Sequence, residues 1–301
     1  MKIVTSGNRY IDIDAYAGCI AYANLLKLKG IEAKAVSTAK LNESITDNLL
    51  QLNTKLDEYD KDSDDEFIII DVSNKEYFDN IVNDNKIVEV IDHHIGYEDY
   101  WKKILGERAN IEFIGAVATL IVELYEKEKL IEKMPKDIAY LLMSAILDNT
   151  LNFKAKVTTD RDKLAYKKLE TIVDSKENYA EKYFLECQLN IKKDLKTAIE
   201  NDTKIEKIDS LLPPVFGQLT VWNKEDILEN KKIIHDTLDS IGNTWMMNLI
   251  SLNEGKSYII ASDFEVQKKL EKLLNGKFQN DIMKLDDVWL RKEIIKKTMK
   301  I

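Results

Sequence analysis

The sequence predicts a two-domain α/β protein whose first half is built around a parallel sheet. In that half, short apolar runs alternate with amphipathic stretches, which is the pattern of β-α-β units. The second half resumes the alternation of strands and helices after Pro213-Pro214. The chain has 301 residues, which is long enough for two ordinary domains that each bury a core.

The first half contains four predicted strands and three predicted helices. Residues 67–70 are apolar throughout, which suits a strand buried on both faces. The third helix opens directly after Pro135, and proline is favoured at helix starts. The strands are expected at residues 3–5, 31–36, 67–70 and 87–91, and the helices at residues 15–28, 116–128 and 136–147.

The remainder begins with a polar helical stretch, from residue 160 to about residue 201, which we interpret as a connection between the domains. Alternation resumes after the proline pair, and this predicts a second, smaller sheet flanked by helices. Its strands are expected at residues 215–222, 244–252 and 256–262, and its helices at residues 224–240 and 264–274.

The charge balance restricts the partners. The chain carries 44 Lys and Arg against 53 Asp and Glu, a net charge of −9, which argues against wholesale binding to a nucleic-acid backbone. Residues 57–66 hold seven acids and one lysine and are predicted to form a solvated loop. Residues 288–301 hold five bases and one acid. The net charge therefore leaves room for a small phosphate chain as partner.

Other protein classes are excluded by pattern. No apolar stretch approaches 18 residues, so no membrane span is expected, and the first residues read as a strand rather than a signal peptide. Cys19 and Cys187 form neither a disulfide framework nor a structural zinc site, which favours a cytoplasmic protein. No two of the ten glycines are closer than nine residues, which excludes a P-loop and a dinucleotide fingerprint.

Potential metal ligands end several of the apolar runs. In a doubly wound sheet, ligands bind beyond the carboxyl ends of the strands, so residues distant in sequence can converge there. A single Asp after a strand is more often a helix cap or turn residue, and His235 is expected to be an ordinary packing residue. The adjacent His pair is more specific, because it uses two of only three histidines. The set comprises Asp12, Asp14, Asp71, Asp92, His93, His94 and Asp148.

The ligand types indicate which metals fit. Several carboxylates and an imidazole, without a thiolate, suit Mn²⁺, Mg²⁺ or Co²⁺ better than structural zinc. Two such ions, about 3.5–4 Å apart and bridged by a carboxylate, can activate a water and clamp a phosphoryl oxygen. We therefore expect two divalent metal ions, with Mn²⁺ as the first choice.

The order D-x-D, Asp, D-H-H, Asp resembles the DHH phosphoesterase superfamily, carried by SGNRYIDIDAYAGCIAYA, FIIIDVSN, EVIDHH and LLMSAILDNTLNF. The second half resembles the DHHA2 type of C-terminal domain shared by family II inorganic pyrophosphatases and exopolyphosphatases, mainly through Lys204 and Arg291-Lys292. The resemblance implies a DHH catalytic domain at residues 1–190, a smaller DHHA2 substrate-binding domain at residues 195–301, and an active site in the cleft between them.

The resemblance also implies a role for each residue. Asp71 would bridge the two metals, Asp92 would orient the histidines, and His94 would lie near the substrate or leaving group. The implied metal ligands are Asp12, Asp14, Asp71, His93 and Asp148. The implied substrate-binding residues are Asn8, Lys204, Arg291 and Lys292.

Two departures from the pyrophosphatase pattern affect the expected substrate. Asn8 stands where pyrophosphatases have a histidine, which is similar to the exopolyphosphatase branch, and Leu290 replaces the serine before Arg291. An amide oxygen binds transition metals less well than imidazole, so looser metal binding and slower pyrophosphate turnover are expected. The predicted activity is hydrolysis of phosphoanhydride bonds in inorganic polyphosphate, with pyrophosphate second.

Two alternatives remain open. A non-catalytic sensor of a phosphorylated ligand is favoured by Asn8, because loss of a metal ligand can be a step toward inactivity. A phosphodiesterase acting on nucleotides or short oligonucleotides would need an aromatic platform for base stacking. Trp289 is the candidate for that platform, although a core role suits it better. The oligomeric state stays open.

Overall fold

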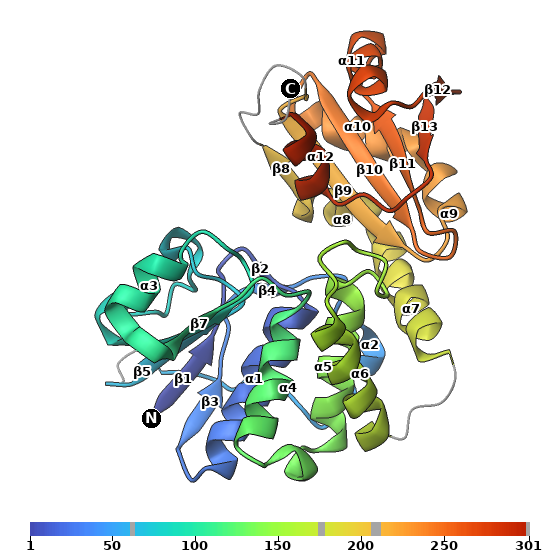
Figure 1. Ribbon diagram of the computed structural model, residues 1–301. Helices are drawn as coiled ribbons and strands as arrows, with labels where there is room; N and C mark the ends of the chain where they lie inside the picture. Colours follow the sequence, from blue (N-terminus) through green and yellow to red (C-terminus); the bar gives the residue numbers. More distant parts are fainter. Residues whose placement is uncertain (61–63, 174–177, 206–211, 299–301) are drawn as a thin grey trace. The chain divides into compact units, whose positions relative to one another are not determined.

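The computed structural model describes residues 1–60, 64–173, 178–205 and 212–298. The chain forms two compact units, Met1–Ala180 and Glu181–Ile301, each of which combines a sheet with helices (Figure 1). The predicted α/β class is therefore confirmed. The units divide inside α7 (Tyr179–Lys193), whereas the first domain was expected to end at residue 190. Within the described residues, no helix is long and apolar enough to cross a membrane.

Unit 1 is built on a five-stranded sheet in the order β3-β1-β5-β6-β7, and every neighbouring pair is parallel. The four strands predicted in this half are all present. The edge strand β7 was missed, because its three residues are only half buried and carry no apolar run. The strands are β1 (Lys2–Thr5), β3 (Ala33–Ala35), β5 (Glu66–Ile70), β6 (Ile87–Asp92) and β7 (Ala109–Ile111), and a separate parallel pair joins β2 (Tyr10–Ile11) to β4 (Lys40–Leu41).

Helices cover both faces of this sheet (Figure 1). Phe67 and Ile69 of β5 pack in the core that contains Trp101 of α3, while Ile70 faces α1. The three predicted helices match α1, α4 and α5 to within two residues at each end, whereas α3 was missed because it has only eight residues, half of them charged. The helices are α1 (Ile13–Leu28), α2 (Asp47–Leu50), α3 (Glu98–Leu105), α4 (Val117–Lys127), α5 (Lys136–Asn149) and α6 (Asp160–Val173).

The acidic run at residues 57–66 is only partly the solvated loop that we expected. Asp57 accepts a hydrogen bond from the N–H of Ala35, 3.2 Å away, and so extends the edge of the sheet beside β3. Asp65 is 4% exposed, and Glu66 begins β5. Residues 61–63 lie outside the described part.

Gly18 allows α1 to approach the sheet closely. A Cβ at this position would lie 2.7 Å from Cγ2 of Ile70 and 3.4 Å from Cγ1 of Val117. Both neighbours are buried and cannot move away cheaply. Since Ile70 directly precedes Asp71, the glycine also controls how near the start of α1 comes to the end of β5.

We therefore predict that Gly18→Val destabilises the protein. Three extra carbon atoms in a filled core force neighbouring side chains to shift, which typically costs about 1–3 kcal/mol. Urea denaturation should show this as a lower midpoint with an unchanged slope. An unchanged midpoint would mean that the α1–β5 contact is not tightly packed.

Unit 2 is built on a six-stranded mixed sheet in the order β12-β13-β11-β10-β9-β8. β9 and β10 are parallel, and the other neighbouring pairs are antiparallel. The three predicted strands correspond to β9, β10 and β11, and the short strands β8, β12 and β13 were missed. The strands are β8 (Thr203–Ile205), β9 (Val215–Val221), β10 (Trp245–Ser251), β11 (Lys256–Ala261), β12 (Phe278–Gln279) and β13 (Ile282–Leu285).

Two apolar clusters sandwich this sheet. One contains residues of α8 and α10, and the other contains residues of α11 and α12. The helix expected at residues 224–240 is in fact two helices, because Asn230 leaves helical geometry and its side chain donates to the carbonyl oxygen of Asp226. The helices are α8 (Leu195–Asn201), α9 (Glu225–Leu228), α10 (Lys231–Ile241), α11 (Phe264–Leu274) and α12 (Arg291–Thr298).

Candidate metal centre

The strand order of unit 1 places a ligand site between β1 and β5. The connection from β1 through α1 leads to β3 on one side of β1, and β5 lies on the other side. At such a reversal the loops that leave neighbouring strands diverge and open a crevice at the carboxyl ends. Asp71 follows β5, His93 follows β6, and the chain that leaves β1 leads to Asp12 and Asp14 at the start of α1.

Asp12 and Asp14 each accept hydrogen bonds from the N-terminal end of a helix, α1 for Asp12 and α4 for Asp14. Asp12 caps α1 and accepts a hydrogen bond from the N–H of Ala15 at 3.0 Å, so the capping role is present. Asp14 is fully buried, and its two oxygens accept from the N–H groups of Val117 and Ala118 at 2.8 and 2.9 Å. These donors belong to the first turn of α4, whose own cap residue supplies no side-chain acceptor.

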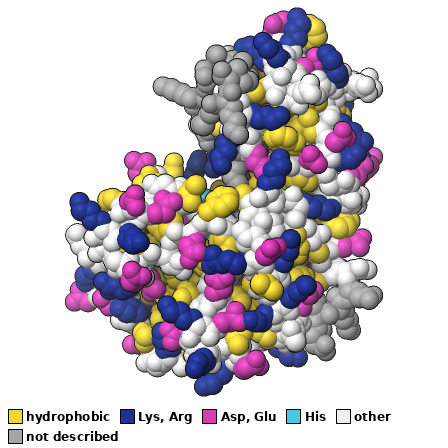
Figure 2. All heavy atoms as spheres, in the orientation of Figure 1, with side chains coloured by type: hydrophobic (Ala, Val, Ile, Leu, Met, Phe, Trp, Pro, Cys, Tyr) yellow, Lys and Arg dark blue, Asp and Glu magenta, His cyan; other side chains and the backbone are white. Residues whose placement is uncertain are grey.

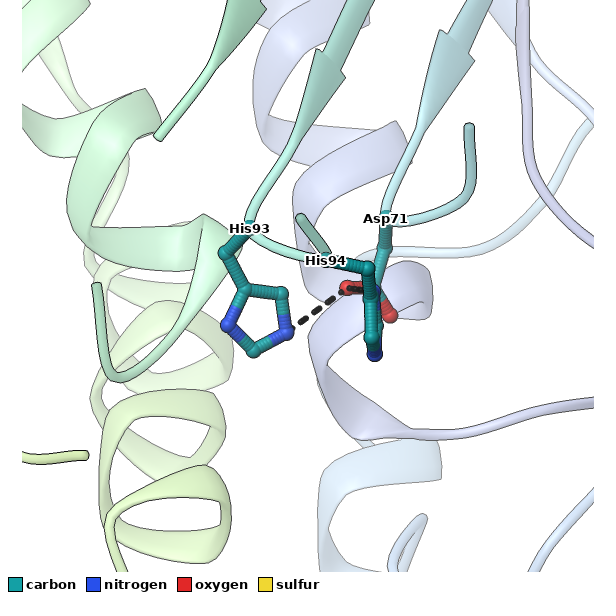
Figure 3. Close-up of side chains that lie close together, drawn as sticks. All are labelled: Asp71, His93 and His94. Carbon is teal, nitrogen blue, oxygen red and sulfur yellow. Dashed lines mark ion pairs between the residues drawn. The ribbon is translucent and has the colours of Figure 1, made fainter. Parts of the chain in front are cut away.

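His93 presents a lone pair to two of the carboxylates. Its Nδ1 lies 3.0 Å from the carbonyl oxygen of Ile114, and a carbonyl can only accept, so Nδ1 carries the hydrogen. In the neutral ring, Nε2 is therefore an acceptor. Nε2 lies 3.2 Å from Oδ1 of Asp71 (Figure 3). It also lies 3.8 Å from Oδ2 of Asp14. A histidine that binds a metal is oriented in this way, by donating its other nitrogen to a carbonyl.

Asp71 is held in an unfavourable state. Its φ of 63° lies in the left-handed region, and its buried Oδ1 makes no hydrogen bond within the described structure. Burial, followed by the nearby Asp12 charge, raises the pKa of Asp71 well above its usual value, although His94 acts in the opposite direction. Burial and the Asp71 charge raise the pKa of Asp14 in the same way. Both carboxylates therefore lack a positive charge that would offset their burial.

Asp92 and His94 form the outer part of the group. Oδ1 of Asp92 accepts from the N–H groups of His93 and His94 at 2.7 and 3.0 Å, and lies 2.8 Å from Nδ1 of His94. Burial alone would raise the pKa of Asp92, but the hydrogen bond and charge of His94 outweigh it, so this pKa is lowered and the carboxylate stays ionised. The His94 side chain is 63% exposed, which leaves its Nε2 facing outward.

The donor set fits a divalent cation. Oxygen and nitrogen atoms of Asp71, His93 and His94 all lie within 4.8 Å of one another (Figure 3). Acceptor atoms that point at each other in a buried site repel unless a cation lies between them. Carboxylates with one imidazole suit Mn²⁺ or Mg²⁺. Among the described residues, Asp71, His93 and His94 are thus grouped closely enough to hold such an ion, and Asp14 lies beside them, with its Oδ2 3.8 Å from Nε2 of His93.

The other predicted residues of unit 1 lie in separate elements. Asp148 is the penultimate residue of α5, which packs against α1 and is followed by a left-handed turn at residues 151–153. Asn8 lies in the loop between β1 and β2, where its N–H donates to the carbonyl oxygen of Tyr77 at 2.8 Å. Their predicted roles as metal ligand and substrate-binding residue stay predictions.

Two of the predicted substrate-binding residues come together in unit 2. Lys204 is exposed on β8 and pairs in register with Phe216 of β9. Arg291, the first residue of α12, donates from Nη1 to the carbonyl oxygens of Phe216 and Asp202, at 2.6 and 2.8 Å, and pairs with the Asp202 carboxylate. Its side chain is only 9% exposed. Lys292 follows in α12, and its side chain lies outside the described residues.

Sequence reasoning missed the backbone groups that orient these ligands. The carbonyl of Ile114 selects the tautomer of His93, and the first turn of α4 holds Asp14. Any residue can supply a backbone carbonyl or N–H, so no sequence signal could have identified them.

Comparison with known proteins agrees with this geometry. Residues 2–146 match the DHH family, N-terminal domain. The chain is similar to the manganese-dependent inorganic pyrophosphatase of Bacillus subtilis strain 168, with 26% identity over 302 residues that cover 97% of this chain and 96% of the relative. The resemblance predicted from the motifs is thus confirmed.

Two crystal structures share the fold. One is of a candidate family II inorganic pyrophosphatase from Methanococcus jannaschii, with a TM-score of 0.66, 21% identity and 99% coverage of both chains. The other is of an exopolyphosphatase-related protein from Bacteroides fragilis, with a TM-score of 0.53, 12% identity, and coverage of 99% of this chain and 90% of that one. At these identities the similarity concerns the fold alone.

The raised pKa values predict how pH affects the metal-free protein. A carboxyl whose pKa is raised on folding contributes stability below its unfolded pKa of about 4, and that contribution is lost as pH rises toward the raised value. In chelator, wild-type stability should therefore fall from pH 4 upward, and Asp71→Asn should fall less steeply. Asparagine also tolerates the left-handed backbone at this position.

Thermal melts of both proteins from pH 4 to pH 8 measure this, with the exposed Asp99→Asn as control. Adding Mn²⁺ at 100 times its Kd should stabilise the wild type by about 2.7 kcal/mol and should stabilise Asp71→Asn less. Identical pH slopes for wild type and Asp71→Asn would contradict the uncompensated charge at Asp71.

Proposed function

The chain carries the N-terminal domain of the DHH family at residues 2–146, and on that premise we propose that it is a metal-dependent phosphohydrolase that cleaves inorganic pyrophosphate with Mn²⁺. The observation that carries the proposal is the buried group of facing acceptors, Asp14, Asp71 and the Nε2 of His93. Pyrophosphate is favoured as substrate because the similarity to the B. subtilis enzyme extends over nearly the whole chain.

The residues of unit 1 divide the work of metal binding. Asp71, which has an unbonded oxygen, is proposed to bridge two divalent ions, with Asp12, Asp14, His93 and Asp148 as the remaining ligands. When bound, such ions supply an activated water and neutralise charge on the transferring phosphoryl group. The protein contributes rigidity, since Ile114 and the start of α4 prevent His93 and Asp14 from turning away.

His94 is the residue proposed to handle the leaving group. Asp92 accepts from Nδ1 of His94, so the outward-facing Nε2 is the atom that can donate a hydrogen bond or a proton to a phosphate oxygen. Three donors converge on Asp92, which fixes the direction of the ring without any contribution from the substrate. Asp92 is thus a positioning residue in this proposal.

Positive charge for the substrate is proposed to come from Lys204, Arg291 and Lys292. Arg291 has five N–H donors on its guanidinium, and three are used in hydrogen bonds to Asp202 and Phe216. Within the described residues no hydrogen bond uses the other two donors, which are proposed to bind a phosphate oxygen. Lys204 pairs in register with the same Phe216 whose carbonyl oxygen binds Arg291, so both residues lie beside this position of β9.

Inorganic polyphosphate is the second candidate substrate. Asn8 favours it, because the amide replaces the imidazole that pyrophosphatases carry at this position. The N–H of Asn8 is bonded to Tyr77, so the loop is anchored while the side chain differs in chemistry. A longer phosphate chain offers more oxygen atoms for cations to bind and could compensate for a weaker metal site.

The two competing functions receive less support. Trp289, the candidate base-stacking platform, packs against the core between the sheet and α11, and Lys297 lies over its ring at 4.4 Å. On the face shown in Figure 2, Lys and Arg side chains are interspersed with Asp and Glu and form no extended basic area. A sensor without catalysis would not require the facing acceptors of Asp14, Asp71 and His93.

Phosphate release is the direct test. Wild-type protein should release phosphate from pyrophosphate or tripolyphosphate with Mn²⁺, and chelation should abolish release, because the uncompensated carboxylates repel phosphate. Asp71→Asn should lower kcat by at least about 10³-fold, since it removes one charged ligand shared by both ions.

The control for this test is Asp99→Asn, which removes an exposed carboxylate and should leave the rate unchanged. Preference for a dinucleotide over both phosphate chains would move the protein to the phosphodiesterase class. Absence of release from every substrate with Mn²⁺, Mg²⁺ and Co²⁺ would leave only the sensor.

Asn8→His tests the substrate preference. An added imidazole should tighten Mn²⁺ binding by at least about tenfold, because even groups that only orient ligands have effects of that size. It should also raise turnover of pyrophosphate relative to tripolyphosphate. Calorimetric Mn²⁺ titration and the ratio of the two kcat values measure this. If both stay at wild-type values, position 8 does not distinguish the two substrates.

A further inference from the structure

The sheet of unit 2 contains polar side chains where its fold requires apolar ones. Asn248 of β10 and Ser257 of β11 are fully buried, and Gln218 of β9 is half buried and pairs in register with Asn248. Gln218 and Asn248 share the face of Phe216 and Met246, which form part of the apolar core beneath α11 and α12. Oδ1 of Asn248 has no hydrogen-bond partner within the described residues. Burying such groups costs stability, so a compensating role is expected.

All three side chains bind the backbone of the segment that leads into α12, residues 289–291. Oε1 of Gln218 accepts from the N–H of Arg291 at 2.8 Å, and Nδ2 of Asn248 donates to the carbonyl oxygen of Trp289 at 2.6 Å. Oγ of Ser257 accepts from the N–H of Trp289 at 2.9 Å. Asn248 also donates to Gln218 at 3.3 Å, which links the first two groups. Three adjacent strands therefore contact the backbone of residues 289–291.

Arg291 is consequently held at both ends. Gln218 binds its backbone N–H, and Asp202 and the Phe216 carbonyl bind its guanidinium. Neither contact consumes the two remaining guanidinium donors. The direction of these donors is thus determined by residues on β9, β10 and β11 and by the residue that precedes β8.

We infer that Gln218, Asn248 and Ser257 are positioning residues that orient Arg291 toward the terminal phosphate of the substrate. The inference rests on the proposed function, in which Arg291 binds that phosphate. A charged donor contributes most when its direction is fixed before the substrate arrives, because no ordering cost is then incurred on binding. All three residues belong to unit 2, and the proposed metal ligands belong to unit 1.

This role predicts a specific kinetic signature. Gln218→Met removes the acceptor for Arg291 while keeping the length of the side chain, and Ser257→Ala removes the acceptor for Trp289. Each should raise the KM for pyrophosphate by about 3- to 10-fold, the effect of one lost hydrogen bond. Mn²⁺ affinity should stay at the wild-type value, because the proposed metal ligands belong to unit 1. Gln218→Glu keeps an acceptor oxygen and should recover most of the loss.

Matched controls lie in the same strands. Thr220→Val changes a polar residue on the same face of β9, and Ser251→Ala removes a buried hydroxyl that bonds Trp222 and Asn253 instead of the turn. Both should leave KM unchanged. Thermal melts of every variant separate a change in KM from a loss of folded protein.

The outcomes distinguish failure of the proposed function from failure of the proposed role of Gln218, Asn248 and Ser257. If the wild type releases no phosphate, the proposed function fails and this inference fails with it. If the wild type is active but Gln218→Met and Ser257→Ala keep its KM, the inference alone is overturned. It is also overturned if the two controls raise KM equally, or if Mn²⁺ affinity falls while KM rises.

Discussion

The candidate metal centre of unit 1 depends on three acceptor atoms that the fold forces to face one another. Oδ2 of Asp14, Oδ1 of Asp71 and Nε2 of His93 cannot relieve their repulsion by rotating, because α4 holds Asp14 and Ile114 holds the ring of His93. Only a cation, or protonation, can offset the repulsion. The close approach of α1 to β5 at Gly18 and the reversal of strand order between β1 and β5 both serve to bring these atoms together.

The two units apply the same principle with opposite charge. Unit 1 fixes facing acceptor atoms in a buried group, and unit 2 fixes the guanidinium of Arg291 through Asp202 and its backbone through polar side chains of the sheet. In both cases side chains or backbone groups from neighbouring elements remove the freedom of the functional group. Preorganisation of this kind suits phosphoryl transfer, in which the protein mainly positions groups and stabilises charge.

Periodicity predicted the elements whose burial is decided locally. Residues 67–70 are all apolar and residues 87–91 are apolar except for Glu89; each stretch is followed by an acid, and they form β5 and β6 within one residue of the expected bounds. The helix at residues 264–274 has both predicted ends. Helix α3 was not predicted, because only its Trp101 and Leu105 are buried. Strand β7 was not predicted either, because it forms through pairing with β6 and not through a local sequence pattern. The helix predicted at residues 224–240 is instead two helices, α9 and α10, separated at Asn230, whose side chain donates a hydrogen bond to the carbonyl oxygen of Asp226.

The sequence by itself determined the chemical kinds of the site residues and their order, since the D-x-D, Asp and D-H-H elements follow strands that hydrophobic pattern alone identifies. Tertiary structure decided which groups contact and orient each of these residues. Asp14 meets Val117 across 103 positions of sequence, and Arg291 meets Gln218 across 73. The partners in both contacts include backbone N–H groups, which every residue but proline carries. Such contacts leave no trace in local composition, and they arise only when the packed sheets bring the two segments together.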